Sequence, residues 1–295
     1  MTAQADPTYV DPDDIRRTHL RAAARRAARR MTTHRIAQKA AAAAFFFGLA
    51  VLMAVASAVG ITGLWLAPGD IARGPVSTLF ADTTTELVLA QLRDVAATRD
   101  GTLTLGTVVG LIFAVVLAAL GTRVLVRMLN LAYGQSEARS ATAFLAAVAG
   151  LTVILLLMFV VKLAVVTVPP VLLALMNDLP FWETIIATAR WPLFFLIAVG
   201  TPVLTYRIGP CPRAARVRVI SPGHVMAAAV WALGTAAFAL QVEAMGSYNE
   251  VFALILAAIT LLGWLWLSVF AIALGALFDA ELEQEILHNV AAEGS

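Results

Sequence analysis

Long apolar segments separated by short polar ones make up most of the chain after residue 39. A helix needs about 20 apolar residues to cross a hydrocarbon core that is about 30 Å thick. Each segment reaches about that length, so the pattern predicts an all-α integral membrane protein with six transmembrane helices. The six segments are residues 40–66, 103–120, 141–168, 190–208, 222–243 and 251–278.

Proline and capping residues predict where several of these helices begin and end. Pro169 and Pro170 are expected to stop the third helix, because proline cannot donate a backbone hydrogen bond. Asp178 and Pro180 form an N-cap and first-turn pair, so a long helix that contains residues 190–208 should begin there. Ser221, followed by proline, should cap the fifth helix in the same way.

Two further segments have the pattern of short amphipathic helices. Residues 83–97 repeat apolar positions at helical spacing, which predicts a helix lying on the outer surface of the membrane. Residues 121–134 carry Arg123, Arg127 and Asn130 on one face of a helix. This polar stripe either faces water at the interface or, with Tyr206 and Arg207, lines a polar entrance on the cytoplasmic side. The sequence leaves both interpretations open.

Composition and charge place the chain in a membrane and orient it. Hydrophobic residues make up 60% of the chain, charged residues only 14%, and the mean hydropathy is +0.84, which excludes a water-soluble globule. The cations gather in the N-terminal arm, in residues 121–140 and in residues 207–220. Cytoplasmic segments are enriched in Lys and Arg, so both termini are expected in the cytoplasm. The predicted domains are a partly disordered basic arm (1–38), a six-helix transmembrane domain (39–284) and an acidic cytoplasmic tail (285–295).

The basic arm has two interpretations. Between Arg16 and Lys39 lie nine of the chain's 21 cations, at a spacing that suits a helix. The arm could bind nucleic acid, or it could fix the topology and contact anionic lipid headgroups. No aromatic residues alternate with the arginines to stack on bases, which favours the second interpretation. Membrane lipids are therefore the expected partners, and no nucleic acid is expected.

Polar residues inside the apolar segments supply a candidate binding site. Counted at about 1.5 Å per residue from the cytoplasmic ends of their helices, Lys162, Arg190 and Glu243 lie roughly 24–32 Å away, at the outer leaflet. We predict a cluster there in which a glutamate pairs one cation and the second cation holds an anionic headgroup. The alternative is that these side chains extend separately to the outer surface. The residues are Lys162, Arg190, Glu243, Gln241 and Glu183.

The sequence shows no arrangement typical of an enzyme or a metal site. The four histidines stand alone among ordinary residues. The single cysteine excludes a disulfide within one chain and any cysteine-based metal site. No Gly-rich Lys-Ser/Thr loop of nucleotide-binding proteins occurs. We therefore expect no enzymatic activity, no metal and no cofactor.

Several motifs resemble the YihY/BrkB family of bacterial inner-membrane proteins. They are RWPLFFLIAVGTPVLTYRIGP, the SPG element with the following helix that contains Trp231, and GSYN with Tyr248 and Asn249. The resemblance covers roughly residues 40–285 and implies six spans and an inner-membrane location. The chain departs from the family pattern at Leu277 and Asp279, where the family usually has a glutamate and an asparagine. It also lacks the usual proline in residues 40–66, and it has Phe-Ala at 252–253 in place of Tyr-Gly.

The resemblance implies little about activity, because the family's functional labels disagree. They include a ribonuclease activity widely regarded as misassigned, a link to virulence, and lipid export in one branch. We expect a transporter or flippase for an amphipathic, anionic, lipid-like substrate. The alternative is a non-catalytic structural or partner subunit, and the ribonuclease is the least favoured. The sequence leaves open the substrate, the energy source and whether the chain forms a homo-oligomer.

Overall fold

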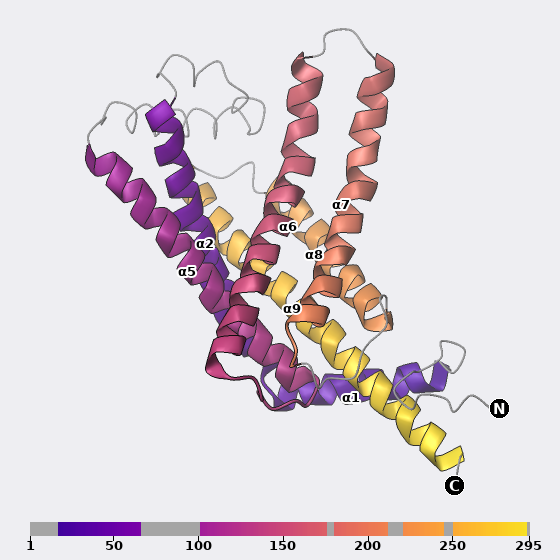
Figure 1. Ribbon diagram of the computed structural model, residues 1–295. Coiled ribbons are helices and arrows are strands. Elements are labelled where there is room, and N and C mark those ends of the chain that lie inside the picture. Colours follow the sequence, from indigo (N-terminus) through magenta and orange to yellow (C-terminus); the bar gives the residue numbers. More distant parts are fainter. Residues whose placement is uncertain (1–16, 66–100, 176–179, 212–220, 245–249, 294–295) are drawn as a thin grey trace, which may run out of the picture. The chain divides into compact units, whose positions relative to one another are not determined.

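The computed structural model describes residues 17–65, 101–175, 180–211, 221–244 and 250–293. Throughout these ranges the regular secondary structure is helical, and no strand occurs in them (Figure 1). The helices are α1 (Arg17–Thr33), α2 (Ile36–Trp65), α5 (Gly101–Ala132), α6 (Ala141–Leu175), α7 (Pro180–Ile208), α8 (Pro222–Ala244) and α9 (Glu250–Glu293).

Five of these helices are long and apolar enough to cross a membrane. Large apolar side chains are exposed along them, as lipid-facing side chains are: Leu105 is 66% exposed and Leu233 is 74% exposed. A shorter apolar helix, Pro192–Ile208, lies within α7 at the position of the predicted fourth span. The five candidate spans are Ile36–Ala58, Leu105–Ala132, Ala141–Lys162, Pro222–Gln241 and Ile255–Glu285.

Two predicted boundaries are wrong, and the last helix is longer than the span predicted within it. Residues 121–132 continue α5 and do not form a separate interfacial helix. Helix α6 runs through Pro169 and Pro170 to Leu175, since helices in membranes tolerate proline where the freed carbonyls find other partners. Helix α9 passes Phe278 and reaches Glu293, so the acidic run after Phe278 is helical. The predicted surface helix at 83–97 and the Gly-Ser-Tyr-Asn motif lie outside the described residues.

The chain divides into two compact units. Unit 1 comprises residues 1–46, 120–153 and 199–295, and unit 2 comprises residues 47–119 and 154–198. In unit 2, α2 and α5 approach closely at small residues: a side-chain carbon at Gly110 would meet Ser57, and one at Gly60 would meet Thr107. Small residues allow this approach between membrane helices.

Unit 1 is built around α9, against which α8 and α1 both pack. Helix α1 crosses the C-terminal half of α9 (Figure 1), where Ala23 of α1 is fully buried against Phe278 and Leu282. Helix α8 runs antiparallel to α9, and polar side chains link the two: Trp231 donates to Ser268 at 3.0 Å, and Trp264 donates to Thr235 at 3.1 Å. Such bonds are typical of helix contacts within membranes.

Candidate functional site

Five polar side chains of unit 1 gather where the first turn of α8 meets α9, and we call them the buried polar cluster. Each is at most 8% exposed. Burying polar and ionisable groups in a membrane protein is costly, so such a group marks a candidate functional site. The cluster consists of Tyr133, Tyr206, Ser221, His224 and Asp279.

Ser221 and Asp279 together cap the N-terminus of α8. Ser221 is the N-cap residue, because its carbonyl and its hydroxyl oxygen both accept from the His224 N–H, at 3.1 Å and 3.4 Å. Asp279 of α9 accepts the Gly223 N–H at Oδ1 at 2.7 Å, and its Oδ2 accepts the Ser221 hydroxyl. A carboxylate is favourable at the positive end of a helix dipole, so Asp279 joins α8 to α9.

His224 is held by the same turn. Its Nδ1 accepts the Ser221 backbone N–H at 3.0 Å, lies in contact with the Ser221 hydroxyl, and is 3.8 Å from Oδ2 of Asp279. A backbone N–H can only donate, so Nδ1 is an acceptor and the ring proton belongs on Nε2. The Tyr206 ring lies 4.7 Å from the His224 ring, and the Tyr206 hydroxyl donates to the Ile272 carbonyl at 2.5 Å.

The order of these groups differs from that of a hydrolase triad. In Ser-His-Asp hydrolases the histidine lies between the serine and the aspartate and takes the serine proton. Here Ser221 lies between His224 and Asp279, and its hydroxyl donates to the carboxylate. The arrangement therefore stabilises the Asp279 carboxylate and places the Ser221 hydroxyl where it can bond either neighbour. It does not place a base to activate Ser221 as a nucleophile.

Tyr133, which follows α5, adds a buried hydroxyl to the cluster. Its ring packs edge-to-face on Tyr206, with the ring centroids 6.5 Å apart. Its hydroxyl has no hydrogen-bond partner within the described residues. Burial, together with the negative charges of Asp279 and Glu283, raises the pKa of Tyr133 far above its usual range. The phenol therefore remains a proton donor at physiological pH.

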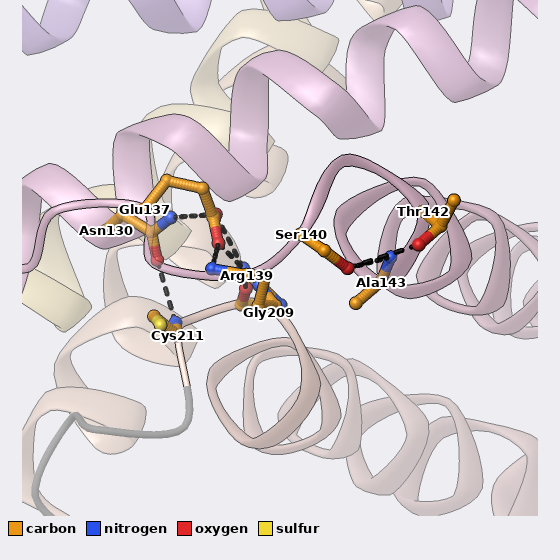
Figure 2. A network of polar contacts seen from close by, with 8 residues as sticks. All are labelled: Asn130, Glu137, Arg139, Ser140, Thr142, Ala143, Gly209 and Cys211. Atoms are coloured by element: carbon orange, nitrogen blue, oxygen red, sulfur yellow. Dashed lines mark hydrogen bonds and ion pairs between the residues drawn. The ribbon is translucent and has the colours of Figure 1, made fainter.

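A second polar network fastens the end of α5 to the end of α7 (Figure 2). Asn130 accepts the Cys211 N–H at 2.8 Å and donates to Glu137 at 2.7 Å. Glu137 accepts from Arg139 at 2.7 Å, and Arg139 also donates to the Gly209 carbonyl at 3.0 Å. The hydrogen bond from Arg139 lowers the pKa of Glu137 to about 2, so this link is fully charged near neutral pH.

Ion pairs join α1 to the C-terminal half of α9, and we call this set the arginine clamp. Arg30 pairs with Glu281 at 2.6 Å, and Arg26 pairs with Glu281 at 3.1 Å and with Glu285. Arg30 also donates to the Leu131 carbonyl at 3.1 Å. The Glu281 side chain is only 3% exposed, so the arginines neutralise an acid that water does not reach.

The predicted entrance residues occupy different environments. Arg123, Arg127 and Arg207 are exposed. Asn130 is buried and belongs to the network of Figure 2, whereas Tyr206 belongs to the buried polar cluster. The entrance itself stays a prediction.

The predicted outer-leaflet site stays a prediction as well. Lys162 is half-buried in α6 of unit 2. Gln241 is exposed on α8 of unit 1 and donates to Thr260 at 3.4 Å. The remaining members have side chains outside the described set: Glu183, Arg190 and Glu243. Of the motif residues, Trp231 bonds Ser268, and Tyr248 and Asn249 lie outside the described residues.

Sequence reasoning missed Asp279 and Glu281 as site residues, because they begin an acidic run that has the composition of a tail. It also treated His224 as an isolated histidine. The sequence did contain a signal for this site. Gly275 and Asp279 share a helical face, and the Ser-Pro-Gly element predicts a helix N-terminus, which can bind a carboxylate.

Comparison with known proteins gives one match. The model of a family described as Virulence factor BrkB matches residues 27–294, which is nearly the whole chain. Neither the curated proteins nor the solved structures contain a match.

Proposed function

Because the chain belongs to the Virulence factor BrkB family, we propose that it is a transporter or flippase of the bacterial inner membrane. Its substrate would be an anionic, lipid-like amphiphile. The family match and the five long apolar helices make the chain a multi-pass membrane protein. The observation that carries the transport proposal is a half-buried lysine deep in one of these helices.

Lys162 is that lysine. Helix α6 is continuous from Ala141 past Lys162, which therefore lies about 32 Å along the helix, at 1.5 Å per residue. A cation at the centre of the hydrocarbon core costs about 3 kcal/mol on insertion scales and less toward the interface, and ionisable groups retained in membrane helices commonly mark substrate pathways. We propose that Lys162 and Arg190 lie near the outer leaflet with Gln241, Glu183 and Glu243, and that one cation holds a phosphate-like headgroup.

The alternative is a structural or partner subunit without turnover. Large apolar side chains exposed on α5 and α8, such as Leu105 and Leu233, suit either lipid or a neighbouring membrane protein. We propose no enzymatic activity, and the ribonuclease remains the least favoured function. Loss of transport on changing the intramembrane cations separates transport from the alternative, because a merely structural subunit has no substrate for them to hold.

Lys162→Met and Arg190→Met should each reduce transport at least tenfold while leaving insertion intact, because each removes a charge that would hold the substrate headgroup. The measurement is the movement of fluorescent phosphatidylglycerol across vesicles that contain the purified protein. Lys39→Met is the matched control, since Lys39 is exposed at the start of α2. If both test variants insert normally and move the lipid like the parent, the outer-leaflet site is wrong and the partner role is preferred.

We propose six spans with both termini in the cytoplasm, in which α7 is the fourth span and adds to the five long apolar helices. The native Cys211 is a poor reporter of this topology, because it is only 3% exposed. In a Cys211→Ala background, Ser136→Cys, at an exposed position, should react with an impermeant maleimide only after permeabilisation. Thr84→Cys, in the loop assigned to the outside, should react in intact cells. Labelling of the Ser136→Cys variant in intact cells would contradict this topology.

We also propose that the outer face of α1 contacts anionic lipid headgroups. Arg26 and Arg30 point to α9 in the arginine clamp, whereas Arg25 and Arg29 are exposed on the same helix. An amphipathic helix with an arginine-rich polar face is suited to lie on an anionic membrane surface.

A further inference from the structure

We propose that Ser221, His224 and Asp279 form a proton-binding site, in which the Asp279 carboxylate takes up one proton and Ser221 exchanges its hydrogen-bond acceptor. The site goes beyond the proposed transport function, since a proton-binding carboxylate requires no particular lipid. Three observations support this site: the order of the three groups, their burial, and the position of the Ser221 hydroxyl between two acceptors, Nδ1 of His224 and Oδ2 of Asp279.

In the unprotonated state the Ser221 hydroxyl, the Ser221 backbone N–H and the Gly223 N–H each have an acceptor. The Ser221 hydroxyl donates to Oδ2 of Asp279, and the Gly223 N–H donates to Oδ1 at 2.7 Å. The His224 Nδ1 accepts the Ser221 backbone N–H at 3.0 Å. One negative charge is then buried at the N-terminus of α8, where the helix dipole favours it.

In the protonated state the carboxyl and the hydroxyl again have acceptors, and the single lone pair of His224 Nδ1 is shared by the Ser221 hydroxyl and the Ser221 backbone N–H. A proton bound at Oδ2 of Asp279 is donated to the Ser221 oxygen, and the Ser221 hydroxyl turns to donate to Nδ1 of His224, with which it is already in contact. The net change is one O–H bond formed on Asp279 and one acceptor exchanged. A buried carboxylate usually loses its hydrogen-bond donor partners on protonation, so this arrangement removes a cost that opposes proton binding.

The charged and titratable groups around the triad come from every element packed on it. The Tyr206 ring contacts the His224 ring at a tilt of 45°, and the positive charge of Arg207 in α7 also acts on His224. Glu283, one turn further along α9, adds a negative charge near Asp279. The arginines of α1 pair with Glu281 and Glu285, so within the described ion pairs the only basic group facing Asp279 is His224.

Tyr133 is an independent observation at the same place. Its hydroxyl is buried without a partner in the described residues, and the charge of Asp279 acts on it. A donor left unsatisfied beside a buried carboxylate favours a site that exchanges protons or water over an inert structural cap. Proton binding removes the charge from Asp279 and weakens its bond to the Gly223 N–H, because charge-assisted bonds are stronger. The joint between α8 and α9 should therefore loosen on acidification.

Infrared difference spectroscopy of the purified full chain in phosphatidylglycerol nanodiscs tests the site. On acidification the parent should gain a carboxylic-acid carbonyl band, one component of which disappears in Asp279→Asn. Glu137→Gln is the matched control and should keep that component, because the pKa of Glu137 is about 2 and its carboxyl titrates below the range used. Ser221→Ala removes a donor to the carboxylate, so it should bind the proton about tenfold more tightly.

Superimposable spectra of Asp279→Asn and the parent at every pH, or no carboxylic-acid component down to pH 4, would overturn the proposal. If Asp279→Asn does not yield folded protein, Ser221→Ala decides between a proton-binding site and an inert cap. A shift of the titration to higher pH supports the site, whereas an unshifted titration means that Asp279 does not bind the proton through this triad.

Discussion

Replacing Gly275 by valine is expected to force α8 away from α9 and to destabilise the fold strongly. A side-chain carbon at Gly275 would overlap the Tyr206 hydroxyl, the Gly223 carbonyl oxygen and Ala227. The carbonyl belongs to the backbone and cannot rotate away, so the helices must separate. Overpacking costs about 1–3 kcal/mol where side chains can shift, and this substitution should lie at or above the upper end. Thermal unfolding in detergent measures the loss.

Gly150→Val is the matched control for this substitution. Gly150 also lies within a long apolar helix, α6, but a side-chain carbon there would meet nothing within 4 Å. It should unfold close to the parent's temperature, which separates a clash from a general effect of valine in a membrane helix. Equal melting temperatures for Gly275→Val and Gly150→Val would show that the close crossing at Gly275 does not hold α8 to α9.

The ends of several helices could be predicted from the sequence because local chemistry determines them. Helix α7 begins at Pro180 and α8 begins at Pro222, each at a proline in the first turn, as expected. Helix α8 ends at Ala244, one residue from the predicted boundary. Apolar length alone identified the five segments that are long enough to span a membrane, since a bilayer of fixed thickness sets the required run.

Other boundaries could not be predicted because contacts far along the sequence determine them. The acids after Phe278 have the composition of a tail, yet Glu281 is buried by arginines of α1 that precede it by about 250 residues. Asp279 likewise acquires its role from the N-terminus of α8, 56 residues away. A local pattern shows that a carboxylate is present, but only the packing shows which helix end it caps.

The arginine clamp should make Arg30→Met strongly destabilising. The Glu281 side chain is 3% exposed, whereas those of Arg30 and Arg26 are 24% and 43% exposed. Loss of an arginine therefore leaves the buried negative charge of Glu281 without one of its partners. Removing one partner of a buried pair costs about 3–5 kcal/mol, and the remaining Arg26 should place this variant near the lower value. Thermal unfolding should show the loss, and trypsin should cut α1 faster as it leaves α9.

The double variant Arg30→Met/Glu281→Met tells whether Arg30→Met loses stability because Glu281 is left unpaired or because the arginine side chain no longer packs. Replacing a whole buried ion pair by apolar residues is often neutral or stabilising, so the double variant should be more stable than Arg30→Met alone. Arg29→Met is the control, because Arg29 is exposed on the neighbouring face of α1 and should change stability by less than about 0.5 kcal/mol. If the double variant is less stable than Arg30→Met, Glu281 stabilises the fold without Arg30. The clamp would then rest on Arg26 alone.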